Sequence, residues 1–195
     1  MAFRQLWWSL AVSNVCDGVR LAALPVLAAA CTAQPLLVSA VVVLPRLPWL
    51  IAPLLAVPID TADRRRFLAA ADLSRGVALL AAAAVALLAG VSIPLLIAVG
   101  VVLGVGEVYF NSALTAMLPA VAPADRLLRA NARLATTETV AQSAGHPLGG
   151  FLAGVAAAAP LVFDAVTYFG SWWFVRQVPP QVPVPNVAAR GDGLR

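Results

Sequence analysis

Long apolar runs separated by short polar breaks make up most of the chain. The runs cover about residues 6–30, 36–59, 68–91, 93–118, 134–159 and 161–178. An α-helix needs roughly 20 apolar residues to cross a hydrocarbon core of ~30 Å, and each run comes close to that length. The pattern therefore predicts an all-α integral membrane protein, a bundle of six transmembrane helices within residues 1–178.

The breaks between the runs carry turn and stop signals. They fall at residues 32–35, 60–66, 90–94, 119–126 and 159–160. Several contain proline or glycine, which end helices or allow tight turns. Because the links are short, we expect consecutive helices to lie antiparallel.

Among the links between the runs, only alternate ones carry basic residues. The second link, the fourth link and the tail carry arginines, namely Arg64, Arg65, Arg66, Arg126, Arg129, Arg133, Arg176, Arg190 and Arg195. The first, third and fifth links carry no charge. Loops rich in arginine stay in the cytoplasm, so both termini are predicted to be cytoplasmic.

Composition excludes a soluble globular domain. The chain is 62% hydrophobic and 11% charged, against roughly 45–50% and 25% in soluble domains. Its net charge of +4 resides in clusters between apolar runs, which fits membrane orientation and not nucleic-acid binding. The first run is 25 residues long and includes Asp17 and Arg20, so it is interpreted as a membrane helix and not as a cleaved signal peptide.

Residues 179–195 differ in composition from the bundle. This segment is rich in proline at first and then polar with glycine, a pattern typical of an extended cytoplasmic linker. Elsewhere the chain contains no P-loop, no nucleophile elbow and only one histidine. The sequence therefore predicts no enzyme, no cofactor and no metal site, and Cys16 and Cys31 are interpreted as packing residues.

Charged side chains inside the apolar runs are the candidate functional residues. Such a charge near the bilayer centre costs at least ~2.5–3.5 kcal/mol on insertion scales, so it needs a partner, a wet cavity or a role. Asp17 and Arg46 lie about 16 Å and 15 Å from the starts of their helices, near the midplane. Arg20 follows Asp17 by three positions on the same face, so the two can form a pair within one helix.

Glu107 lies past the middle of the fourth run, with Asn111 one turn later on the same face. Arg46 has no partner in its own helix, so we expect it to pair with Asp17 or Glu107 across the bundle. A carboxylate in a poorly hydrated cavity can take up and release a proton during a transport cycle. Glu107 is the first candidate for such a proton carrier. Glu138 and Asp164 lie nearer the helix ends, where modest tilting would let them reach water.

Three stretches match a known pattern. Residues 6–18 contain Leu-Trp-Trp and then Ser-Asn-Val-Cys-Asp-Gly, and residues 60–66 contain Asp60, Arg64 and Arg65 at the spacing of a loop signature. Residues 128–134 are followed by a Gly-Pro-rich centre formed by Gly145, His146, Pro147, Gly149 and Gly150. Residues 161–168 and 191–195 continue the pattern. Together these strings resemble the N-terminal half of a major facilitator superfamily exporter, of the branch of enterobactin- and macrolide-efflux-type proteins.

Some positions depart from that family pattern. Ala56 and Thr61 replace a glycine and an arginine of the loop signature, and His146 stands where proline is usual. With Gly154, the glycines of the fifth run form a small-residue face that would let a neighbouring helix approach closely. Histidine titrates near neutral pH, although a neutral packing role for His146 is also open.

The resemblance implies a secondary transporter in a bacterial plasma (inner) membrane that exports a small amphipathic compound, drug or siderophore in exchange for protons. Asp17, Arg20, Arg46, Glu107 and Asn111 would line its pathway. One six-helix bundle supplies one wall of the substrate cavity, so a C-terminal six-helix half or a second copy would be needed as a partner. The alternative is a truncated, non-transporting half-carrier or membrane scaffold.

Overall fold

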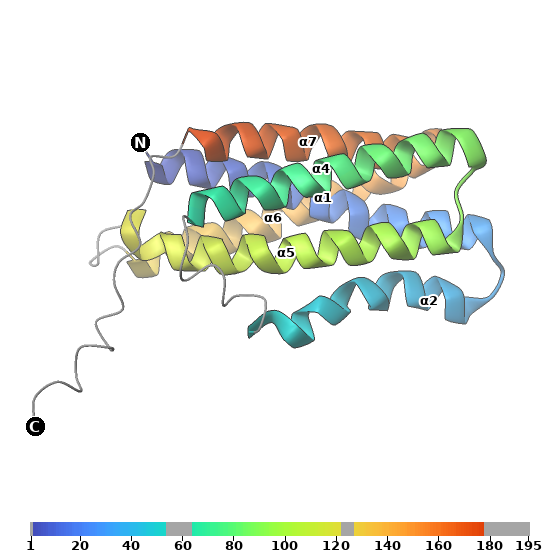
Figure 1. The fold of residues 1–195 in the computed structure, drawn as a ribbon, viewed down its shortest axis with the longest axis horizontal. Coiled ribbons are helices and arrows are strands. Elements are labelled where there is room, and N and C mark those ends of the chain that lie inside the picture. Colours follow the sequence, from blue (N-terminus) through green and yellow to red (C-terminus); the bar gives the residue numbers. More distant parts are fainter. Residues whose placement is uncertain (1, 54–63, 122–126, 178–195) are drawn as a thin grey trace, which may run out of the picture.

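The computed structural model describes residues 2–53, 64–121 and 127–177, and nearly all of them are helical (Figure 1). The helices are α1 (Ala2–Cys31), α2 (Pro35–Val43), the 3-10 helix η1 (Leu44–Ile51), α4 (Arg64–Ala89), α5 (Ile93–Val121), α6 (Leu127–Val155) and α7 (Ala159–Arg176). The linker at 179–195 lies outside the described residues.

Helix α1 is the centre of the bundle. It packs against α6, α7, α2 and α5, while α4 packs against α7 and α5, and η1 lies on α5. Figure 1 shows the long helices running along a common axis, with the start of α1 and the end of α7 at the same end. Gly90, at φ 83°, makes the tight turn between α4 and α5.

The bundle has an apolar exterior and a partly polar interior. Side chains such as Leu87, Leu88, Phe151 and Trp173 are exposed, whereas Asp72 and Arg75 are almost fully buried. A water-soluble monomer rarely exposes so much contiguous apolar surface. The arrangement suits a hydrocarbon solvent, which stabilises apolar side chains on the outside and confines charges to the interior.

Three helices in the described ranges are long and apolar enough to cross a membrane. They cover Trp7–Cys31, Arg65–Ala89 and Ile93–Thr115. Pro35–Ile51 is apolar but shorter, α7 is 18 residues long, and α6 carries polar side chains along much of its length. Of the six membrane spans expected from the sequence, three are thus supported by the length and hydropathy of their helices.

The second apolar run is not one continuous α-helix as predicted. It forms α2 and then η1, which contains Pro45 and Pro48, and residues 54–59 lie outside the described residues. Proline lacks the backbone N–H of a regular α-helical hydrogen bond, which explains the tighter segment. The backbone of Pro45 approaches Gly104 of α5 so closely that a Cβ at Gly104 would collide with it. This contact brings Arg46 beside α5.

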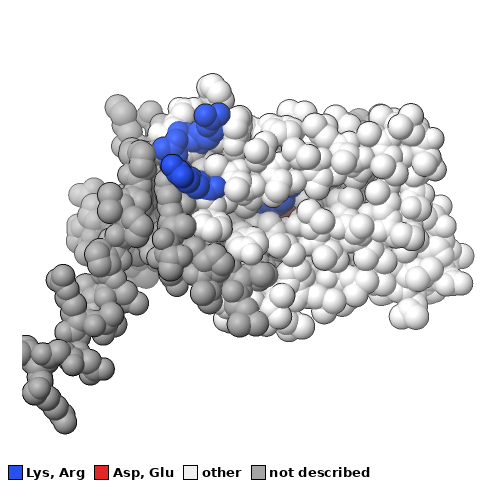
Figure 2. All heavy atoms as spheres, viewed as in Figure 1, with Lys and Arg blue, Asp and Glu red and all other residues white. Residues whose placement is uncertain are grey.

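Arginines gather at one end of the bundle. Arg65 Nη2 donates to the carbonyl oxygen of Arg176 at 2.5 Å, and the Arg133 guanidinium lies 4.8 Å from the Trp7 ring centroid. Arg129 and Arg133 lie within α6 and not in a link as expected, because α6 begins at Leu127. On the face shown in Figure 2, the exposed blue side chains lie toward the end that holds the N-terminus, a recessed blue patch lies near the middle, and the opposite end carries none.

Close contact between α1 and α6 depends on glycine. A Cβ at Gly145 or Gly149 would collide with the backbone of Val15 or Val19, and one at Gly18 would collide with Gln142. Nothing lies within 4 Å of the Cβ position at Gly150 or Gly154. Residues four apart share a helix face whereas residues five or nine apart do not, so the expectation that Gly150 and Gly154 belong to this face is wrong.

Replacing Gly145 with alanine is expected to destabilise the bundle by about 1–3 kcal/mol, because α1 and α6 must separate to make room for the methyl group. Denaturant unfolding in detergent micelles measures the change. Gly154→Ala is the matched control, since its methyl group points into open space, and should leave stability unchanged or slightly raised. Equal losses in both variants would contradict the glycine contact.

Candidate functional site

Four charged side chains from three segments meet inside the bundle. Arg20 Nη2 donates both to Asp17 Oδ1 at 2.9 Å and to Glu107 Oε2 at 2.7 Å. Arg46 Nη1 lies 3.7 Å from Glu107 Oε1. The structure therefore contains the pair predicted within α1, and of the two partners considered for Arg46 it selects Glu107.

The four groups differ in burial. The side chains of Asp17, Arg20 and Glu107 are 11%, 7% and 15% exposed, whereas that of Arg46 is 53% exposed. Arg46 thus forms the open side of the cluster, on the irregular segment η1. A cavity of about 30 Å³, large enough for roughly one water molecule, is lined by Arg20, Arg46 and Glu107 and otherwise by apolar side chains of α1, α2 and η1.

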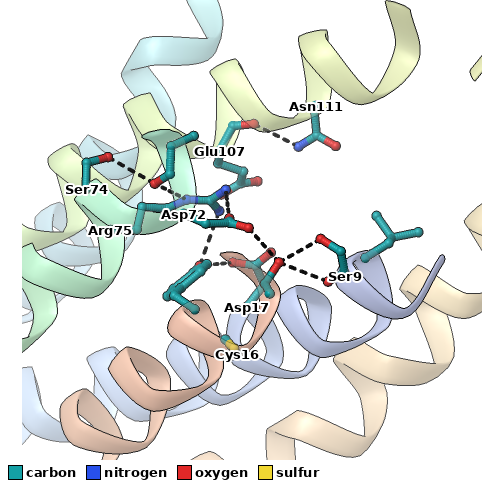
Figure 3. A network of polar contacts seen from close by, with 12 residues as sticks. Ser9, Cys16, Asp17, Asp72, Ser74, Arg75, Glu107 and Asn111 are labelled. Carbon is teal, nitrogen blue, oxygen red and sulfur yellow. Dashed lines mark hydrogen bonds and ion pairs between the residues drawn. The ribbon is translucent and has the colours of Figure 1, made fainter. Parts of the chain in front are cut away.

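A second buried ion pair lies on α4. Arg75 Nη2 is 2.9 Å from Asp72 Oδ1, and these two side chains are 1% and 0% exposed. Ser171 of α7 donates to Asp72 Oδ2 at 2.6 Å, and the Ser9 hydroxyl of α1 lies 2.7 Å from that of Ser171 (Figure 3). Both carboxylate oxygens of Asp72 therefore have partners.

Tyr168 of α7 connects the two ion clusters. Its hydroxyl donates to Asp17 Oδ1 at 3.0 Å and accepts from Arg75 Nη1 at 3.4 Å. The Arg75 guanidinium also lies 4.6 Å from the Tyr168 ring centroid and 5.0 Å from that of Phe110. A continuous chain of polar contacts thus runs from Arg46 on η1 to Ser9 on α1, with contributions from α4, α5 and α7.

Asp72, Arg75 and Tyr168 were not among the site residues predicted from the sequence. Asp72 and Arg75 are three residues apart, the same order and spacing as Asp17 and Arg20, so that pattern was a usable signal. Tyr168 carried no comparable signal, because its role depends on contacts with residues 93 and 151 positions away.

The remaining candidate residues lie outside this cluster. Asn111 donates its side-chain N–H to the Glu107 carbonyl of its own helix at 3.0 Å. His146, Pro147 and Glu138 are exposed on α6. Arg64 and Arg65 begin α4, while Asp60 lies outside the described residues.

Asp164 is buried, with 2% exposure, and its Oδ1 has no hydrogen-bond partner. The expectation that it reaches water by tilting is wrong, because α1 and α4 cover this face of α7. Across the described ranges, no group of three or more His, Cys, Asp or Glu side chains is placed to hold a metal ion.

Removing the Tyr168 hydroxyl tests the connection between the clusters. Tyr168→Phe is expected to lower the free energy of unfolding in detergent by about 1.5–3 kcal/mol, since a hydrogen bond to the charged Asp17 is lost while the ring still stacks on Arg75. Tyr109→Phe serves as the control, because its ring stacks on Phe67 and its hydroxyl has no hydrogen bond among the described residues. A Tyr168→Phe change as small as that of the control would contradict the connection.

An apolar exterior, helices long enough to span a bilayer and buried charges at mid-helix define a multi-pass helical membrane protein. In a comparison with known protein families, the profile of the Major Facilitator Superfamily matches residues 6–194. The chain therefore belongs to this superfamily of membrane transporters. No curated protein matches the chain.

Proposed function

We propose that the protein is a secondary active transporter of the efflux type, which exports a small amphipathic compound in exchange for protons. The observation that supports this most is the cluster of Asp17, Arg20, Arg46 and Glu107, because buried charges in membrane helices are costly and mark ion or substrate pathways. Members of a transporter superfamily are generally not enzymes.

Arg20 is the central group of the proposed coupling. Its Nη2 is shared between two carboxylates, so its position depends on the charge of each. A proton on Glu107 would weaken the contacts to Arg20 and Arg46, and Arg20 would then pair with Asp17 alone. Arg46, already half-exposed, would be released from α5. Because η1 carries Arg46 and packs closely on α5, this release gives protonation a route to a change in helix packing.

The surface of α6 supports a partner on that side. Thr136, Glu138, Thr139, Ser143 and His146 are exposed on α6, and these polar side chains suit a wet cavity better than lipid. A hollow of about 570 Å³ between α1 and α6 is lined by Trp7, Arg129, Arg133, Thr136 and Thr137 among others. We place the substrate cavity here, with its other wall supplied by a second six-helix half or a second copy.

The arginine-rich end is assigned to the cytoplasm by the positive-inside rule, in a bacterial plasma membrane. We include Asn111, which lies one turn after Glu107 on α5, among the residues that line the pathway. Gly145 and Gly149 with Pro147 would allow α6 to bend while held against α1, which suits closure of one side. The loop signature at Asp60, Arg64 and Arg65 would lie at the cytoplasmic end.

Transport in proteoliposomes tests the proposal. The protein is purified from its native membrane with any six-helix partner that accompanies it, and is reconstituted with a pH gradient of either sign. A panel of fluorescent amphipathic cations, anions and neutral dyes, with ethidium as the first member, reports movement. We expect at least one dye to move against its gradient and to stop when a protonophore is added. Movement that the protonophore leaves unchanged, or no gradient-dependent movement across the panel, would contradict the proposal.

A further inference from the structure

Charge balance inside the bundle leaves one carboxyl group unpaired. In the described part of the chain, Asp72 pairs with Arg75, and Asp17 and Glu107 pair with Arg20 and Arg46. The formal charges of these six side chains sum to zero. Asp164, on α7, is the remaining buried acid, and it forms no ion pair within the described ranges.

The surroundings of Asp164 disfavour a negative charge. Its Oδ1 is buried and accepts no hydrogen bond, and an isolated carboxylate in such a place costs far more than a neutral acid. The groups that act on it come from α1: Cys16, Asp17 and the cation Arg20. On α4 the Asp72–Arg75 pair is internally balanced, on α7 itself Tyr168 is bound to Asp17, and on α6 Glu138 and His146 are exposed.

Arg20 also has an unused group. Its Nη1 is buried without a hydrogen-bond partner, while its Nη2 makes both contacts to Asp17 and Glu107. A buried unpaired donor and a buried unpaired acceptor thus belong to residues that interact electrostatically. A buried donor or acceptor without a partner is unfavourable, so both groups would gain by meeting in another arrangement.

We propose that Asp164 is a second proton-binding site of the transporter, which holds its proton in the described conformation and exchanges that proton for contact with Arg20. When the site opens to water, the carboxylic O–H bond breaks, the proton passes to water, and Arg20 Nη1 donates to the new carboxylate. The net charge of the cluster then falls by one. The use of this proton in a transport cycle rests on the proposed function, whereas its presence on Asp164 does not.

Infrared spectroscopy of the full chain in lipid bilayers tests the site without any transport assay. We expect the protein at neutral pH to show a carbonyl band of a protonated carboxylic acid that shifts in heavy water and disappears in Asp164→Asn. Glu138→Gln, which removes an exposed carboxylate, should leave the band intact. A spectrum without the band, or a band that survives in Asp164→Asn, would overturn the proposal.

Thermal unfolding gives a second readout. The asparagine amide resembles the neutral acid in shape, so Asp164→Asn is expected to unfold at the same temperature as the natural protein or slightly above it. A drop of more than roughly 2–4 °C, which corresponds to about 1 kcal/mol in a chain of this size, would show that an ionised Asp164 is stabilising and would overturn the proposal. Asp164→Leu, uncharged but with a bulkier side chain, is a second variant for the infrared measurement, in which it should also lack the band.

The role of Arg20 is tested with Asp17→Asn. Removing the charge of Asp17 leaves Arg20 with one carboxylate fewer, which favours an ionised Asp164. The acid band of Asp164 should therefore lose most of its intensity at neutral pH. An unchanged band in Asp17→Asn would overturn the exchange with Arg20. These spectra do not depend on solute movement, so loss of the band and failure of transport are separate results.

Discussion

Glu107→Gln is expected to abolish proton-driven transport and to leave only passive movement of the solute down its own concentration gradient. The amide cannot carry a proton through the cycle, and it cannot hold Arg20 and Arg46 by charge. In the structure the Glu107 carboxylate contacts both guanidinium groups, so no other described residue can replace it without a rearrangement. Dye accumulation in proteoliposomes, measured as a function of the imposed pH gradient, gives the result.

Arg176→Gln is the control, because it removes a charged side chain at the end of α7, outside the proposed pathway. It should keep the pH dependence of the natural protein. If Glu107→Gln were to export with unchanged pH dependence, Glu107 would not be the proton carrier. The exposed His146 would then be the next residue to replace.

Arg75→Leu is expected to cost about 3–5 kcal/mol of folding free energy, the largest stability loss of any substitution proposed for this chain. The variant leaves the fully buried Asp72 without its cation and removes the stacking of the guanidinium on Tyr168 and Phe110. Unfolding in detergent and the amount of protein inserted into membranes both report the loss.

Combining Arg75→Leu with Asp72→Asn separates charge from packing. If the cost arises from an uncompensated charge, the double variant should be more stable than Arg75→Leu alone, with a coupling energy of about 0.5–3 kcal/mol. Arg176→Gln is the surface control. Its guanidinium stacks on Trp172 at the end of α7, and its loss should cost at most about 1 kcal/mol. Purely additive losses would contradict the ion pair.

The part of the site that depends on one helix could be predicted from the sequence. Asp17 and Arg20 pair as their spacing indicates, because residues three apart share a helix face. Because Arg46 has no acidic partner in its own helix, the sequence left Asp17 and Glu107 as its two candidate partners. The choice of Glu107 depends on the 3-10 segment at Pro45 and Pro48, whose close packing on α5 is a tertiary feature.

The two carboxylates that were missed or misplaced, Asp72 and Asp164, lie near the starts of their apolar runs in the sequence but are buried in the bundle. Asp72 is close to the start of its apolar run, yet α4 begins at Arg64 and Ser171 of α7 covers the carboxylate. Asp164 is close to the start of α7, yet α1 and α4 bury it. Depth along a helix follows from the sequence, whereas burial depends on which neighbours lie beside that turn.

Proton movement driven by solute is the most direct test of the coupling. Proteoliposomes with equal pH on both sides contain a trapped pH indicator, and a gradient of the transported dye is the only driving force. An exchanger predicts that dye leaving the liposomes draws protons in, so the interior acidifies, and that Glu107→Gln eliminates this change while dye movement continues. Dye movement by the natural protein with no change in internal pH would contradict proton coupling and the role assigned to the Asp17, Arg20, Arg46 and Glu107 cluster.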